Sequence, residues 1–159
     1  VGWSACENMM SGVVIIDGNA GSLTGAAFRG GDLVVRGRVG ARTGIDQKGG
    51  TIIVMGSAGS MTGFMMQRGR MIICGDVGPG LGDSMYDGTI YVGGKVQDFG
   101  VDAVPGPMTD LDREWLTSTL GSLAWNEEES IVVLDRSDRL IATAGRGRIP
   151  EGRRAACGG

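Results

Sequence analysis

The sequence contains no histidine, only three cysteines and only four prolines among its 159 residues. Without histidine, the chain cannot build a Ser-His-Asp triad, a Cys-His pair, an HExxH zinc site or an imidazole general base. Cys6, Cys74 and Cys157 are odd in number and far apart, which favours buried thiols in a reducing compartment over a disulfide framework or a zinc site. The four prolines, without a glycine at every third position, exclude collagen.

Further absences narrow the class of protein. No apolar run approaches the length of a membrane span and no signal peptide is visible, so we expect a cytoplasmic protein. A net charge of −3 gives no general attraction to nucleic acid. Because 42% of the residues are hydrophobic, the chain is expected to fold rather than to remain disordered.

What the sequence has in abundance is glycine, with 31 residues. The glycines form four columns with a spacing of 19 residues, beginning at Gly2, Gly12, Gly18 and Gly25. Self-similarity at such a period is typical of solenoid folds. Each copy contains the pattern G-x-x-G-x-x-x-G, whose glycines either turn the chain through positive φ or let adjacent rungs approach closely. These structural repeat glycines are Gly18, Gly21, Gly25, Gly37, Gly40, Gly44, Gly56, Gly59, Gly63, Gly75, Gly78 and Gly82.

A short apolar strand precedes each copy of this pattern. The segments VVIID, DLVVR, TIIVM, RMIIC and TIYVG start 19 residues apart, at Val13, Asp32, Thr51, Arg70 and Thr89. Their central positions are mostly β-branched, as is usual for a pleated surface packed on both sides. The sequence therefore predicts an all-β fold, a right-handed parallel β-helix with 19-residue rungs.

Two neighbouring ladders of strand residues are candidates for the interior of this β-helix. One ladder is Val14, Leu33, Ile52, Met71 and Ile90, and the other is Ile15, Val34, Ile53, Ile72 and Tyr91. A second, looser apolar column consists of Phe28, Met66 and Met85 and is interrupted by Gln47. Methionine suits irregular interior space of this kind.

The repeats occupy residues 1–104, and Pro105-Gly106-Pro107 ends the array. Gly2 already lies partway through a rung, and the chain begins with Val1 rather than methionine, so we expect further rungs upstream. Residues 105–121 are predicted to form a linker and a capping helix from about Asp110 to Leu120, started by Thr109 or Asp110 and ended by Gly121. Its apolar face would be Leu111, Trp115 and Leu116, covering the last rung as a lid.

Residues 122–159 are predicted to form a small hairpin and a flexible tail. The strands would be Ile131–Leu134 and Leu140–Thr143, joined by the turn Asp135-Arg136-Ser137-Asp138. The stretch from Gly145 onward is rich in arginine and glycine, and we expect it to be mobile.

Several segments resemble known sites, but each has a simpler structural explanation. Residues 71–82 resemble a dinucleotide-binding turn, yet the last glycine of GxGxxG is replaced by Asp83 and no helix is predicted to follow. Residues 88–95 fail the P-loop pattern at Thr89 and Val96. Cys74 is expected to be a buried thiol. The arginines at 146, 148, 153 and 154 are expected to form a solvated tail rather than a binding site for an acidic partner.

Asp83, Ser84 and Tyr86 depart from the preceding copies, so this turn is the one place where a local functional variation is conceivable. A polar turn facing solvent or a partner is the favoured interpretation. No residues are nominated as catalytic, cofactor-binding or metal-binding.

The glycine columns resemble the GXGXG domain family. The family includes the C-terminal β-helix of the large subunit of glutamate synthase, the glutamate-synthase-like subunit of N-methylglutamate synthase, and the corresponding β-helical subunit of formylmethanofuran dehydrogenase. The resemblance covers residues 1–104, and the segment GDVGPGLGDSMYDGTIYVGGKVQDFGVDA, with the following PMTDLD, is most similar to the N-methylglutamate synthase type.

The resemblance implies a non-catalytic scaffold subunit or domain of a glutamate-synthase-type oxidoreductase complex that makes glutamate or a related product. A glutamine amidotransferase and subunits with FMN and iron–sulfur clusters would then be partner chains, and this chain would hold no cofactor. Two alternatives are the equivalent subunit of formylmethanofuran dehydrogenase and an independent ligand-binding β-helix. The latter usually presents carboxylates or aromatics along one face, and this sequence has only three Trp, two Tyr and three Phe.

Overall fold

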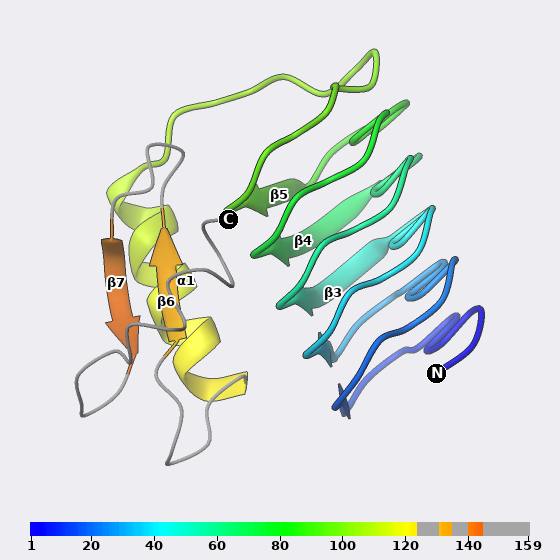
Figure 1. The fold of residues 1–159 in the computed structure, drawn as a ribbon, viewed down its shortest axis with the longest axis horizontal. Helices are drawn as coiled ribbons and strands as arrows, with labels where there is room; N and C mark the ends of the chain where they lie inside the picture. The colour runs from blue at the N-terminus through cyan, green and yellow to red at the C-terminus, as the bar shows by residue number, and fades with distance from the viewer. Residues whose placement is uncertain (124–130, 135–139, 145–159) are drawn as a thin grey trace.

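Five short parallel strands stack into a right-handed parallel β-helix in a computed structural model, which describes residues 1–123, 131–134 and 140–144 (Figure 1). One helix and a two-stranded antiparallel sheet follow the solenoid. The elements are β1 (Val13–Ile16), β2 (Asp32–Val35), β3 (Lys48–Val54), β4 (Arg68–Ile73), β5 (Thr89–Val92), α1 (Asp110–Leu123), β6 (Ile131–Leu134) and β7 (Leu140–Ala144).

The strands pair in the register that the 19-residue repeat predicts. Val14 lies opposite Leu33, and Leu33 lies opposite Ile52, with the same offset up to β5. An equal length for every rung is required because a shift of one residue would turn each strand's inward side chains outward. The predicted fold class is therefore confirmed.

The interior is lined by the ladder that contains Leu33, Ile52 and Met71, all with no exposed surface. Phe28 and Met66, from the second apolar column, are buried as well. The neighbouring ladder, which contains Val34, Ile53 and Ile72, is also buried but lies on the outer face of the sheet, where α1 covers it. Both ladders are apolar because both faces of the sheet are packed.

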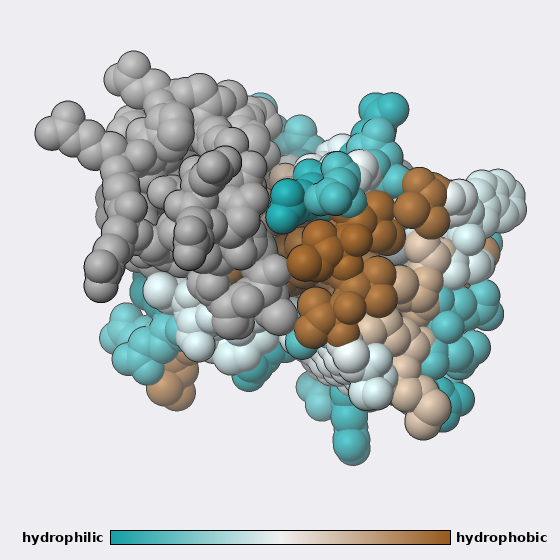
Figure 2. All heavy atoms as spheres, turned by 90° about the horizontal axis from the view of Figure 1, so that it is seen from below, coloured by the Kyte–Doolittle hydropathy of each residue, from teal (hydrophilic) through white to brown (hydrophobic). Residues whose placement is uncertain are grey.

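Hydrophobic side chains are exposed where β1 forms the edge of this sheet, and they gather on the face of the molecule shown in Figure 2. Val13 and Ile15 are 57% and 49% exposed, whereas Val34, the equivalent of Ile15 on the next rung, is buried. Val34 belongs to the cluster of outer-face residues that packs with α1, whereas Ile15 lies outside that cluster, on the edge strand of the sheet.

Helix α1 packs against the side of the β-helix, so its prediction as a lid on the last rung was wrong. Its buried residues are Leu116 and Leu120, which contact the outer ladder of the sheet. Leu111, predicted to face the core, is 77% exposed. The helix also continues through Gly121 to Leu123, three residues beyond the predicted end. In Figure 1 the preceding linker runs back across the top of the molecule, which places α1 beside the strands.

Gln47 takes the place of an apolar residue in the interior and is fully buried. Its side-chain amide Nε2 donates hydrogen bonds to the main-chain carbonyls of Gly49, Gly50 and Arg70, at 3.1, 3.2 and 3.3 Å. The pairing of β3 with β4 is irregular at this corner, between Lys48 and Thr51. Gln47 therefore supplies the donors that the carbonyl groups of an irregular ladder need inside the core.

The antiparallel pair β6–β7 confirms the predicted hairpin strands, with β7 extending one residue further to Ala144. The predicted turn at residues 135–138 and the tail from Gly145 lie outside the described residues. Within the described part of the chain, no helix has both the length and the apolar character that a membrane span requires.

Candidate functional site

Two different structural requirements for glycine occur among the repeat glycines. At Gly59 a Cβ atom would lie 2.6 Å from the main-chain nitrogen of Ala41 on the preceding rung, so this position requires glycine for close approach of two backbones. At Gly63 the backbone has φ of +72°, and a Cβ would lie 2.6 Å from Cδ1 of Ile90 in the core. Both predicted reasons for glycine therefore apply, at different columns of the repeat.

The backbone amides of the segment that resembles a dinucleotide-binding turn are used to hold the rungs together. The amides of Val77, Gly78 and Gly82 donate to carbonyl groups of Lys95, Ala58 and Thr62 on adjacent rungs. β4 leads into the next rung, without a helix between β4 and β5. In the segment 88–95, which was compared with a P-loop, Thr89–Val92 form β5 and the remaining residues flank this strand. These two segments are parts of the solenoid wall.

Cys74 is buried beside the core, as predicted. Cys6 is partly buried and occupies the glycine column of Gly25 with a positive φ of 60°. Burial raises the pKa of the Cys6 thiol, which leaves it in the unreactive protonated form. Cys157 and the arginines of the C-terminal tail lie outside the described residues.

A depression of about 500 Å³ opens at the corner between the fourth and fifth rungs, lined by Met65, Gln67, Arg68, Tyr86 and Asp87. Tyr86 is 75% exposed, and its amide is held by a hydrogen bond to the carbonyl of Met66 at 2.9 Å. Arg68 and Asp87 occupy the same column on successive rungs, yet the ion pairs among the described residues do not include this pair. An open depression with tyrosine, methionine and arginine side chains suits contact with a protein surface.

Of the three residues that set this turn apart in the sequence, only Tyr86 lines the depression. The Ser84 hydroxyl instead donates to the Asp83 carboxylate at 3.0 Å. Ser84 also has a positive φ of 57°, as the equivalent Asp46 and Met65 do in earlier rungs. Asp83 and Ser84 therefore belong to the turn itself, and Tyr86 is the residue of the three that is exposed at the depression.

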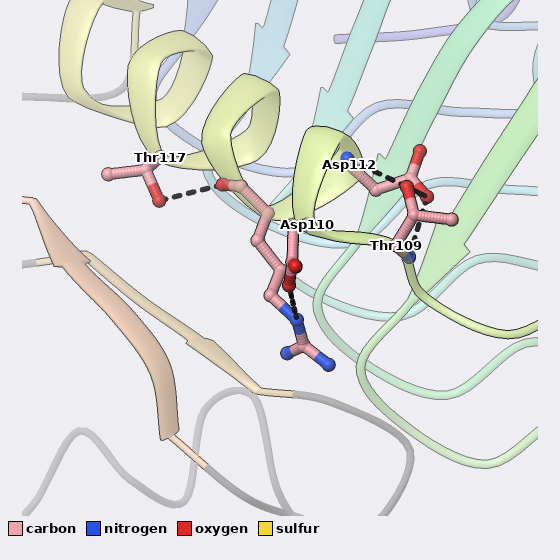
Figure 3. A network of polar contacts seen from close by, with 5 residues as sticks. Thr109, Asp110, Asp112 and Thr117 are labelled. Carbon is pink, nitrogen blue, oxygen red and sulfur yellow. Dashed lines mark hydrogen bonds and ion pairs between the residues drawn. The ribbon is translucent and has the colours of Figure 1, made fainter.

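A network of polar contacts fixes the start of α1 (Figure 3). The Asp112 amide donates to Thr109 Oγ1 at 3.2 Å, and Asp112 Oδ2 accepts from the Thr109 amide at 2.9 Å. This reciprocal pair is a capping box, so Thr109 is the capping residue among the two that the sequence offered. A further ion pair joins Asp110 to Arg113 at 3.9 Å.

Asp112 also ties the helix to the sheet, because its Oδ1 accepts a hydrogen bond from the Tyr91 hydroxyl at 2.7 Å. The Tyr91 ring stacks on Trp115 with centroids 5.6 Å apart. Trp115 also contacts Arg70, whose guanidinium carbon lies 4.2 Å from the centroid of the Trp115 ring. Three elements, β4, β5 and α1, thus meet in one cluster.

The hydrogen bonds in this cluster shift two pKa values in opposite directions. Burial, together with the hydrogen bond to Asp112, raises the pKa of Tyr91 to about 12. Hydrogen bonds from Thr109 and from Tyr91 lower the pKa of the Asp112 carboxyl. Tyr91 is therefore protonated and Asp112 ionised at neutral pH, which is the state in which the bond between them is strongest. The arrangement anchors the helix.

Sequence reasoning missed two features of the molecule that this geometry reveals. One is the Tyr91–Asp112 bond, which no local pattern indicates because the residues are 21 positions apart. The other is a column of buried threonines at Thr24, Thr43 and Thr62, whose hydroxyls donate to the carbonyl three residues earlier. Their 19-residue spacing was a readable signal.

Among the described residues, no cluster of three or more cysteine, aspartate or glutamate side chains is placed to bind a metal ion. Comparison of the sequence with known protein families and with curated proteins finds no match.

Proposed function

We propose that this chain is a non-catalytic scaffold subunit or domain of a glutamate-synthase-type complex. The observation that supports the proposal is the register of the four glycine columns, which resembles the GXGXG family in sequence. The β-helix fold agrees with what that resemblance implies.

The physical character of the solenoid suits a scaffold. Each rung is hydrogen-bonded to its neighbours on several sides, as in the bond of the Gly40 amide to the Gly21 carbonyl at 3.2 Å and that of the Met55 amide to the Val35 carbonyl at 2.9 Å. Repeat arrays of this kind present extended surfaces for binding, so the stack is suited to holding partner chains side by side. The depression beside Tyr86 is a lateral surface at which a partner could be held.

In this proposal the chemistry belongs to the partner chains. A glutamine amidotransferase would release ammonia from glutamine, and a subunit with FMN and iron–sulfur clusters would supply the electrons for its reductive use. This chain would contribute the relative position of the two and no cofactor of its own.

The proposal is tested by affinity purification of the full-length protein from its native host, followed by mass spectrometry and a visible absorption spectrum. Co-elution with an amidotransferase and a flavin or iron–sulfur protein is the expected result. A molybdenum or tungsten enzyme as the partner would replace the proposal with the formylmethanofuran dehydrogenase alternative. A colourless protein that elutes alone would contradict the scaffold function.

A further inference from the structure

One hydrogen bond recurs from rung to rung at the start of the tight turn. In each case the main-chain amide donates to the carbonyl of the residue 18 positions later, on the next rung. The bonds run from Ser4 to Ser22 at 3.0 Å, from Leu23 to Ala41 at 2.9 Å, from Arg42 to Ser60 at 2.8 Å and from Met61 to Pro79 at 2.7 Å. The donors have positive φ values between 54° and 62°, so a strained backbone is stabilised at this position by the next rung.

At the end of the array the same donor is Gly80, and the residue 18 positions later is Asp98. The Gly80 amide donates to the Asp98 carboxylate Oδ1 instead of a main-chain carbonyl. The Asp98 carbonyl accepts from the next amide, that of Leu81, at 3.3 Å. Leu81 also pairs with Phe99, 18 residues away, whereas the earlier bridges join residues 19 apart. At Phe99 the pairing between rungs is therefore one residue out of the 19-residue register.

We propose that Asp98 ends the array by placing its side-chain carboxylate where the main-chain carbonyl of the next rung would lie. Without this acceptor, the Gly80 amide would lack the partner on the next rung that its equivalents on earlier rungs have. The Gly100 amide donates back to the Leu81 carbonyl at 2.8 Å, so the chain closes over the same residues.

Side-chain acceptors also occur inside the array, but they leave the repeat intact. Asn19 Oδ1 accepts from the Arg38 amide at 2.9 Å, and Asp76 Oδ1 accepts from the Lys95 amide at 2.7 Å. In both cases donor and acceptor are 19 residues apart, in register with the repeat. Asp98 differs because its carboxylate is used at the point where that register is lost.

Amide hydrogen exchange in the 159-residue chain tests the proposal, with NMR used to measure the rate at Gly80 and, as a report of global opening, at Ile53. Asp98→Ala is expected to raise the exchange rate of the Gly80 amide about tenfold while the Ile53 rate changes little. Asp98→Asn keeps a neutral oxygen acceptor and is expected to stay within about threefold of the unchanged protein. Asp102→Ala, which removes an exposed carboxylate in the same loop, is the matched control and is expected to have no effect.

Three results would overturn the proposal. The first is an unchanged Gly80 rate in Asp98→Ala. The second is an equal rise at Gly80 and Ile53, which would show general destabilisation rather than a lost local acceptor. The third is an Asp98→Asn variant that behaves as Asp98→Ala does, since the negative charge and not the acceptor position would then be the cause. The inference concerns the fold itself, so none of these results bears on the proposed complex.

Discussion

Replacing Gly59 with alanine adds one methyl group where two rungs touch. The new Cβ would lie 2.6 Å from the Ala41 nitrogen and 2.7 Å from the Gly40 carbonyl carbon, against about 3.5–4.0 Å for an unstrained contact. The rungs must separate by several tenths of an ångström, and overpacking of this kind costs about 1–3 kcal/mol. Since alanine also restricts the unfolded chain, which offsets up to about 1 kcal/mol, we expect a net loss of about 2 kcal/mol.

Thermal and urea unfolding followed by circular dichroism measure this loss, which corresponds to a fall in Tm of about 6 °C for a chain of this size. Gly18→Ala is the control, because no atom lies within 4 Å of its added Cβ. Gly56→Ala belongs to the same column as Gly18 but would meet the Gly37 carbonyl oxygen at 2.8 Å, so it should behave as Gly59→Ala does. Equal stability of all three variants would refute the argument that rung contact, rather than glycine itself, governs these positions.

Three further predictions concern the core, the helix anchor and the exposed corner. Gln47→Glu places a carboxylate against three main-chain carbonyls in the core, so it should lower the free energy of unfolding in urea by about 3–5 kcal/mol. The control is Gln97→Glu at an exposed position, which should change the free energy of unfolding by less than about 0.5 kcal/mol. Because the pKa of Tyr91 is raised from 10.0 to about 12, the contribution of Tyr91 to stability is present below pH 10 and is lost as the pH rises through about 12. Tyr91→Phe should abolish this pH dependence of the free energy of unfolding. The same variant should lack the phenolate absorbance at about 295 nm that appears as Tyr91 ionises. If the scaffold binds a partner at the corner, Tyr86→Ala should reduce the amount of co-purified partner at least about tenfold without changing the Tm, and an unchanged yield would exclude this corner as the contact.

The strands and their register could be predicted from the sequence because stacking makes each residue repeat the environment of the one 19 positions earlier. Val34 and Ile53 illustrate the limit of this reasoning. Their ladder is as apolar as the inward one, since α1 covers it, so the two faces of the sheet could not be told apart from composition alone. The position of α1 was missed for a related reason: the residues of linker 105–109 do not indicate the direction in which the linker runs.

The conformation of the tight turns was even less accessible from the sequence. Leu23, Arg42 and Met61 all have positive φ, although nothing in these residue types favours it. Their strain is offset by hydrogen bonds to the next rung, which exist only after the rungs have stacked. The depression beside Tyr86 depends in the same way on two rungs lying together, and the sequence indicated only that this turn was different.

The scaffold function is tested most directly by reconstituting the partner complex with and without this chain. When the chain is omitted, we predict that the amidotransferase retains its glutaminase activity and that the flavin protein is still reduced by an electron donor. Glutamine-dependent synthesis of the amino-acid product should nevertheless be lost, and it should return when the chain is added. Product synthesis at an equal rate without the chain, at the same partner concentrations, would contradict the scaffold function.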